Sequence, residues 1–315
     1  MTRPIRNWWT HSKTVALIWS FCIILSFSLL QFALKNSSSS SHGYPSSSSD
    51  SPISNMELRS RLYDKMARDL DEKGPTFLNH RETSQSLSLS DIFTIENGSV
   101  VPVFKAANPP VRANVLYLNP EYSVPIWQTV KEIFSPYFDK AIWFQDPILF
   151  HFSMFHASHH VVAVTATQDE IEAEVRAVGA VAKDLCPLKI VLDRVVLTST
   201  GVLLGCWQVI SGPDPVMIRA KLQTVLPRAP KNQLYDPAIL HTSLARILGH
   251  PKASHMEPSD ELEFFHKLVD RLNNKIRGSE AVVSELWYVE EYDLLALALD
   301  GKRKVRKFQL GCERT

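Results

Sequence analysis

Two stretches of the sequence share a pattern of residue types that could handle a phosphate. "DPILFHFSMFHAS" and "YDPAILHTSLARIL" each place Asp-Pro and apolar residues before a His-x-Ser. In a β-strand, residues i and i+2 point to one face, so His151 shares a face with Ser153, and His241 with Ser243. The hydroxyl can donate to a phosphate oxygen, and the imidazole can take or give a proton. Two such strands facing each other would put imidazoles on opposite sides of one phosphorus, as in-line displacement requires.

The paired motifs resemble those of the two-histidine (2H) phosphoesterase superfamily, which includes 2′-5′ RNA ligase-like proteins and cyclic nucleotide phosphodiesterases. That family repeats His-x-Thr/Ser between hydrophobic residues, as in "FHFSM" and "LHTSL" here, and "SLAR" resembles the usual continuation of the second motif. The resemblance covers about residues 113–310. It implies an α+β fold that is bilobal and pseudo-two-fold, with two antiparallel sheets flanking a central cleft and helices outside. We expect His151 and His241 to be the catalytic acid and base, and Ser153 and Ser243 to bind the phosphate, with no metal or other cofactor.

Arg246 is a further candidate for binding the phosphate, but its side-chain direction depends on the regularity of the strand. It lies five residues after His241, so a regular pleat would direct it to the opposite face. It reaches the phosphate only if the strand ends or bulges near Ala245.

A histidine cluster follows the first motif. His156, His159 and His160, together with His151, could suggest a metal site. No His-Glu-x-x-His and no acidic partner at ligand spacing accompanies them. We therefore expect a loop or strand-end cluster and no metal.

The sequence around the motifs predicts alternating strands and helices. Thr167 and Glu170 form a capping box at the start of one helix, and the turn residues at 198–201 separate two strands. The expected helices are 123–138, 168–185, 214–226 and 259–276. The expected strands are 114–118, 141–144, 148–155, two within 188–210, 281–290, 292–300 and 304–310. Each half of the domain then runs strand, helix, His strand, and the two halves face each other.

The N-terminal part predicts a membrane anchor. Residues 14–34 carry no charge, and at about 1.5 Å per residue they would span a hydrocarbon core of about 30 Å. This apolar stretch is longer than that of a cleaved signal peptide. Three basic residues precede it and only Lys35 follows closely, so the positive-inside rule puts residues 1–13 in the cytosol.

Beyond the anchor we expect a Ser-rich flexible stem at 35–55, a helical or extended connector at 56–112, and the phosphoesterase-like domain at 113–315. Four apolar residues of the connector repeat at helical spacing and predict one buried stripe. They are Leu58, Leu62, Met66 and Leu70.

This topology makes the chain a single-pass type II membrane protein of the secretory pathway (ER/Golgi), with its domain in the lumen. The glycosylation patterns at Asn36 and Asn97 fit that placement. Cys186, Cys206 and Cys312 would then lie in an oxidising compartment, and the sequence does not select which pair could form a disulfide.

The balance of charged residues limits the kinds of partner that this domain can bind. Thirty-four basic and thirty-three acidic side chains give no field that would gather duplex nucleic acid. A small nucleotide or an RNA end needs only local positive charge. The sequence leaves the oligomeric state open.

The function that these features favour is a metal-independent phosphodiesterase acting on a cyclic phosphate or on a 2′-5′-linked nucleotide or RNA end. One alternative is a non-catalytic, membrane-anchored module that binds phosphate or nucleotide. Another is a type II Golgi glycosyltransferase, which would use an Asp-x-Asp motif. The one match, Asp69-Leu70-Asp71, lies in the expected connector helix, where it is more simply a solvated face.

Overall fold

The computed structural model describes residues 53–79, 87–97, 99–138, 140–252 and 258–312. They belong to one compact unit that extends from Ile53 to Thr315. The expected tail and anchor and nearly all of the stem lie outside the described residues. Among the helices that are described, none has the length and apolar composition needed to cross a bilayer.

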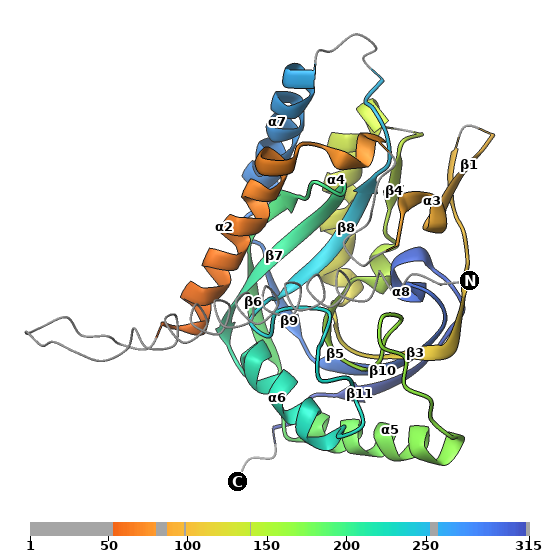
Figure 1. Cartoon of the computed structure of the whole chain (residues 1–315). Coiled ribbons are helices and arrows are strands. Elements are labelled where there is room, and N and C mark those ends of the chain that lie inside the picture. Colours follow the sequence, from red (N-terminus) through yellow and green to blue (C-terminus); the bar gives the residue numbers. More distant parts are fainter. Residues whose placement is uncertain (1–52, 80–86, 98, 139, 253–257, 313–315) are drawn as a thin grey trace, which may run out of the picture. The chain divides into compact units, whose positions relative to one another are not determined.

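Two antiparallel sheets organise this unit (Figure 1). Sheet 1 contains β3 (Ala106–Tyr117), β5 (His151–Ser158), β10 (Glu285–Asp293) and β11 (Arg303–Gln309). Sheet 2 contains β4 (Ile142–Phe144), β6 (Leu188–Leu197), β7 (Val202–Ser211), β8 (His241–Ile247) and β9 (Glu280–Val283). The strand orders are β11-β10-β3-β5 and β4-β8-β7-β6-β9, and every neighbouring pair is antiparallel. A separate hairpin pairs β1 (Phe93–Glu96) with β2 (Ser99–Pro102).

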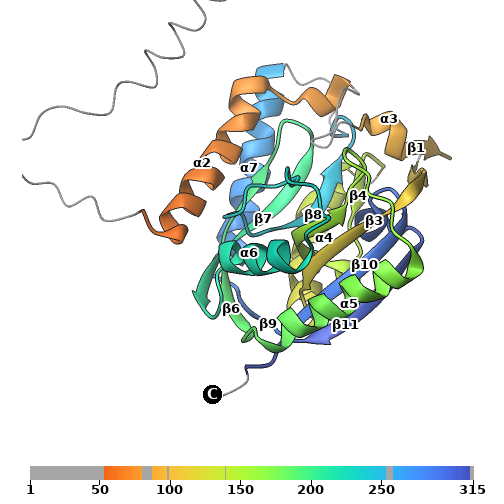
Figure 2. The same cartoon turned by 60° about the horizontal axis from the view of Figure 1, so that its bottom comes forward.

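The helices lie around these sheets (Figure 2). Their bounds are α2 (Asn55–Lys73), α3 (Leu89–Ile92), α4 (Pro120–Phe138), α5 (Gln168–Lys183), α6 (Pro215–Val225), α7 (Pro258–Ile276) and α8 (Ala296–Leu299), with 3-10 turns η1 (Thr76–Asn79) and η2 (Pro147–Leu149). α5 packs on β10 and β11, α6 on β5, α7 on α4 and β6, and α2 on β6 and β7. The capping box predicted at Thr167 and Glu170 is present and begins α5. The chain is therefore an α+β protein built on two antiparallel sheets.

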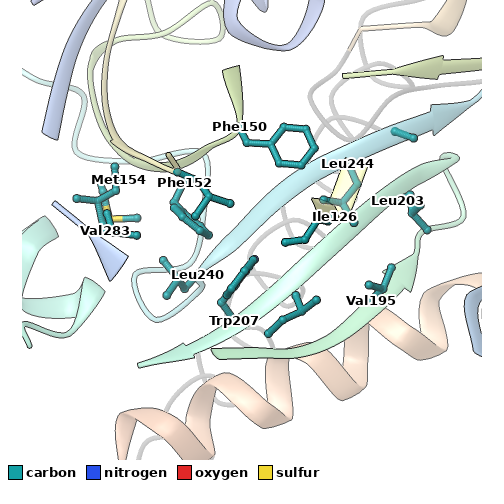
Figure 3. Packing of buried hydrophobic residues seen from close by; sticks show 14 of the residues in the cluster. Ile126, Phe150, Phe152, Met154, Val195, Leu203, Trp207, Leu240, Leu244 and Val283 are labelled. Atoms are coloured by element: carbon teal, nitrogen blue, oxygen red, sulfur yellow. The ribbon is translucent and has the colours of Figure 1, made fainter. Parts of the chain in front are cut away.

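Apolar side chains from both His strands pack into the core (Figure 3). Along each strand they alternate with the motif residues. Phe152 and Met154 of β5 and Leu244 of β8 are at most 3 % exposed, as is Leu240 just before β8. Phe152 packs edge-on against Trp207, with ring centroids 5.8 Å apart. Each such burial contributes roughly 1.5–3 kcal/mol. The predicted division of each strand into a core face and a polar face is confirmed.

Two expected strands differ from the structure. Residues 281–290 are divided at Ser284 between β9 of sheet 2 and β10 of sheet 1. Of residues 292–300, only the first two continue β10, and α8 follows them. Leu295 and Asp300 have φ of 57° and 60° and turn the backbone on either side of α8. The carboxylate of Glu291 accepts the backbone N–H of Leu297 at 2.8 Å, which satisfies a donor of the first helical turn. Periodicity cannot separate a short apolar run in a strand from one in a buried helix.

The stripe predicted for α2 is confirmed at its C-terminal end, where Leu70 is 2 % exposed and Met66 packs against the core, but not at its N-terminal end. Leu58 is 39 % exposed, whereas Arg59 and Tyr63 are 1 % and 0 % exposed. Arg59 forms an ion pair with Asp214 at 2.6 Å and donates to the carbonyl of Ala238 at 2.6 Å. Hydropathy counts Arg59 as a surface residue, but these partners compensate for its burial. The N-terminal half of the helix is therefore buried through Arg59 and Tyr63, and not through Leu58.

Tyr63 of α2 fixes the backbone immediately before the second motif. Its hydroxyl donates to the carbonyl of Leu240 at 2.6 Å or of Trp207 at 2.7 Å, and accepts the N–H of Leu240 at 3.1 Å. Leu240 directly precedes His241. A helix from the predicted connector thus supports a His strand.

We expect Tyr63→Phe to lower the free energy of unfolding by about 1–3 kcal/mol, because it removes the hydrogen-bond partner of the buried N–H of Leu240. Thermal unfolding should show a drop of about 2–4 °C per kcal/mol. Tyr292→Phe is the matched control: it removes a hydroxyl whose hydrogen bond, to Glu290, is long at 3.3 Å, and should change stability by at most about 0.5 kcal/mol. Equal melting temperatures for Tyr63→Phe and the wild type would contradict this role.

A disulfide joins Cys186 to Cys312 across 126 positions of the chain. It links the segment after α5 to the segment after β11. Cys206 is a buried free thiol, and burial raises the pKa of that thiol well above its ordinary value. The pairing that the sequence left open is thus the one between the two positions outside the sheets.

Candidate functional site

The two His-x-Ser strands line one cavity of about 510 Å³, a volume typical of small-molecule sites. β5 supplies His151 and Ser153, and β8 supplies His241, Ser243 and Arg246. β5 and β8 are neighbours in space although they belong to different sheets. All five predicted residues therefore face the same space, between the two sheets.

A bulge follows the serine in both strands. The extra, unpaired residue is Met154 in β5 and Leu244 in β8. Each bulge shifts the following residues by one position relative to the pleat. Arg246 consequently faces the cavity with His241, because β8 contains the bulge near Ala245 that this orientation requires. His156 occupies the corresponding place in β5, and the strands read His-x-Ser-x-x-His and His-x-Ser-x-x-Arg.

Desolvation in the cavity favours the neutral form of both motif imidazoles in the free protein. Burial lowers the pKa of His151, while a hydrogen bond to the carbonyl of Leu149 at 2.7 Å acts in the opposite direction. That bond requires the proton on Nδ1, which leaves Nε2 to exchange a proton with a ligand. Burial lowers the pKa of His241 to about 3, and the positive charge of the nearby Arg219 lowers it further, as would a proton on His151. An anion between the rings would favour their protonated forms.

Arg246 is half-buried and presents a positive charge to the cavity, with its Nη1 shielded from solvent. Within the described part of the chain, its Nη1 has no hydrogen-bond partner. Burial lowers its pKa to about 10. A buried charge without a partner is costly, and a phosphate group carries the oxygens that a guanidinium fork matches.

Arg219 of α6 holds the two motif segments together, and sequence reasoning missed it. It donates to the carbonyls of Ser153 and Met154, both at 2.9 Å, and of Pro237 at 2.6 Å. It is 6 % exposed. The available indication was its place next to Ile218 on the apolar side of the expected helix, where a cation needs internal partners.

The histidine cluster divides between the cavity and the end of β5. His156 and His160 line the cavity, and burial lowers the pKa of His156 to about 3. His159 lies just past the strand, and its Nε2 contacts the carbonyl of Asn232 at 3.1 Å. Across the residues described, no three His, Cys, Asp or Glu side chains gather as a metal site would require. Metal-independent chemistry stays a prediction.

The carboxylates of the Asp-x-Asp motif diverge. Asp69 lines the cavity, but its carboxylate accepts from the hydroxyl of Ser199 at 2.5 Å and pairs with Lys73 at 2.6 Å. Asp71 contacts His266 on α7 at 2.7 Å. The two side chains have separate partners, so this pair does not form a joint metal-nucleotide site here.

Among known proteins, only solved structures match this chain, and they cover about two thirds of it. No protein-family model matches the sequence, and no curated protein gives a significant match. Among solved structures, the protein TT0787 of Thermus thermophilus matches with a TM-score of 0.45 and 14% identity, covering 65% of this chain and 100% of that one. E. coli LigT complexed with 3′-AMP matches with a TM-score of 0.37 and 13% identity over 64% and 98%. A structure described as a phosphoesterase matches with a TM-score of 0.37 and 12% identity over 64% and 98%.

Proposed function

We propose that this protein is a two-histidine phosphoesterase that acts without a metal on a cyclic phosphate or on a 2′-5′-linked nucleotide or RNA end. The observation that carries the proposal is the convergence of two His-x-Ser strands on one cavity that also holds a half-buried guanidinium whose Nη1 lacks a partner among the described residues. The cavity has the volume of a small-molecule site.

In this proposal His151 and His241 act as general acid and base on one phosphorus. One imidazole takes the proton of the attacking water, and the other gives a proton to the leaving oxygen. The hydroxyls of Ser153 and Ser243 donate to the non-bridging oxygens, and Arg246 balances the charge of the phosphate. The acid and base exchange roles when the reaction is run in reverse.

The test is a screen of the full chain, solubilised in detergent, against 2′,3′-cyclic nucleotides and 2′-5′-linked dinucleotides. The proposal expects turnover of at least one class, with and without a chelator. Activity that a chelator abolishes and a divalent ion restores would contradict the metal-independent mechanism. Tight binding of these compounds without turnover would favour the non-catalytic binding module.

The pH dependence should reflect the lowered pKa values of both motif histidines. The acid must be protonated, and in the free protein it loses its proton as the pH rises through a pKa below the ordinary value of about 6.5. We therefore expect kcat/KM to peak below pH 6.5. A bound phosphodiester favours the protonated imidazolium and so raises the histidine pKa values. The bell-shaped pH profile of kcat should therefore lie at higher pH than that of kcat/KM.

Pre-steady-state and steady-state rates of the best substrate between pH 4 and 9 would check this order. The two pKa values obtained from each bell-shaped pH profile are properties of the histidine pair and not of single residues. A kcat/KM optimum above pH 7, or pH profiles of kcat and kcat/KM with the same optimum, would count against a pair of buried neutral imidazoles.

We further propose that residues 14–34 anchor the chain as a type II membrane protein with its domain in the lumen. The disulfide between Cys186 and Cys312 supports an oxidising compartment, and Asn97 is exposed at the turn between β1 and β2. Asn97 should then carry a glycan in secretory cells. An electrophoretic band that glycosidase does not shift, with the domain open to protease in sealed microsomes, would refute this topology.

A further inference from the structure

The cavity has a second end that the phosphate chemistry does not use. This end carries the carboxyl group of Glu291 on β10, and the imidazole of His156 borders it, because His156 pairs with Ala113 of β3. Its apolar walls come from β3 and from the α8 segment. They are Val111, Ala113, Val115, Leu295, Leu297 and Ala298. Trp143 of β4 ties the α8 segment to sheet 2 by donating to the carbonyl of Ala298 at 3.1 Å.

The strand register fixes how far this end lies from the motif residues. Glu291 pairs with Val111, and Ser153 pairs with Val115, so the two are separated by two strand spacings and four residues along β3. At about 4.8 Å per strand and 3.4 Å per residue, their Cα atoms lie about 17 Å apart. Both side chains turn into the cavity and shorten this gap. A mononucleotide with its phosphate at the histidines could therefore place its base near Glu291.

Glu291 can accept more hydrogen bonds than it receives from the protein. It is 7 % exposed, and one of its oxygens takes the N–H of Leu297. A carboxylate has about four acceptor positions and no donor. Burial raises its pKa to about 7, while the bond from Leu297 and the charge of Arg303 oppose the rise. A ligand with N–H donors would hold this carboxyl in its ionised form.

We propose that this end of the cavity is a nucleobase subsite in which Glu291 selects guanine, so that the substrates of the site are guanosine-bearing phosphates. The proposal rests on the phosphoesterase function proposed above. Guanine has an apolar ring face and carries N1–H next to its amino group, so both can donate to one carboxylate. Uracil has a single N–H between two carbonyl oxygens, which a carboxylate repels. Adenine and cytosine each place an amino group beside a ring nitrogen that accepts.

The experiment measures kcat/KM of the full chain on the four 2′,3′-cyclic mononucleotides. One bidentate pair is worth about 5- to 150-fold, so the wild type should favour guanosine over uridine by this ratio. In Glu291→Gln the amide oxygen keeps the bond to the N–H of Leu297, and the NH2 group faces the cavity. Guanosine should lose its advantage, and uridine should gain.

Glu290→Gln is the matched control, because Glu290 is buried on the opposite face of β10 and pairs with Arg306. It should leave the order of the four bases unchanged. Equal rates for all four bases in the wild type, or an equal loss on all four in Glu291→Gln, would overturn the subsite.

A failure of the phosphoesterase proposal would be distinguishable from a failure of the nucleobase subsite. If no cyclic nucleotide is turned over, the dissociation constants of guanosine and uridine 3′-monophosphate decide the question without chemistry. A preference for the guanosine ligand that Glu291→Gln removes would support the subsite. Equal affinities would refute it.

Discussion

Replacing either His151 or His241 with Ala should lower kcat on the best substrate about 10²–10⁴-fold, because each removes one positioned proton transfer. The double variant should fall little further, since the two imidazoles act on the same phosphorus as one unit. Steady-state kinetics of both single variants and the double variant would test this. The three proteins should remain folded, because their core-facing neighbours are unchanged.

His266→Ala is the matched control for this series. His266 is on α7, its side chain is 42% exposed, and it contacts Asp71. It should leave kcat within about twofold, as expected for a residue outside the cavity. A folded His151→Ala or His241→Ala protein with near-normal turnover would show that the pair is not catalytic. The binding-module interpretation would then replace the phosphoesterase.

Replacing Arg246 with Met should lower kcat/KM about 10- to 150-fold while raising stability. The loss corresponds to about 1.5–3 kcal/mol for a hydrogen bond to a charged group. The gain arises because the free protein no longer buries a guanidinium nitrogen, Nη1, that has no partner among the described residues, a cost on the order of 1–3 kcal/mol. Opposite changes in activity and stability are typical of functional sites.

Arg246→Lys keeps the charge but loses the planar fork, so we expect a smaller loss of kcat/KM and a smaller change in stability. Arg176→Met removes an exposed arginine of α5 and should change neither quantity appreciably. Kinetics and thermal unfolding of the same preparations provide both readouts. An Arg246→Met protein that is less stable than the wild type, with unchanged kcat/KM, would assign Arg246 a structural role instead.

The local pattern of the sequence was sufficient for the motif strands and most helices. Alternation places His151 and Ser153 on one face because the pleat repeats every two residues, whatever the rest of the chain does. The capping box at Thr167 and Glu170 likewise depends only on neighbours in the chain. These features were predicted because each is decided within a few residues.

Sequence reasoning failed where long-range partners decide the outcome. Arg59 is a charged residue that only Asp214 and the carbonyl of Ala238 make a buried one. The segment of α8 is apolar enough for a strand, yet the carboxylate of Glu291 and the return of the chain to β11 favour a helix. Local propensity is weak compared with such contacts.

The composition of the cavity was decided by tertiary structure alone. His156 and Glu291 join the motif residues only because two strands bulge and two sheets converge. Arg246 faces the cavity because β8 accommodates one extra residue opposite β7, which reverses the direction of every later side chain. A bulge is set by how two distant strands pair, so the amino-acid order of either strand, taken by itself, determines the His-x-Ser face but not what lies beyond it.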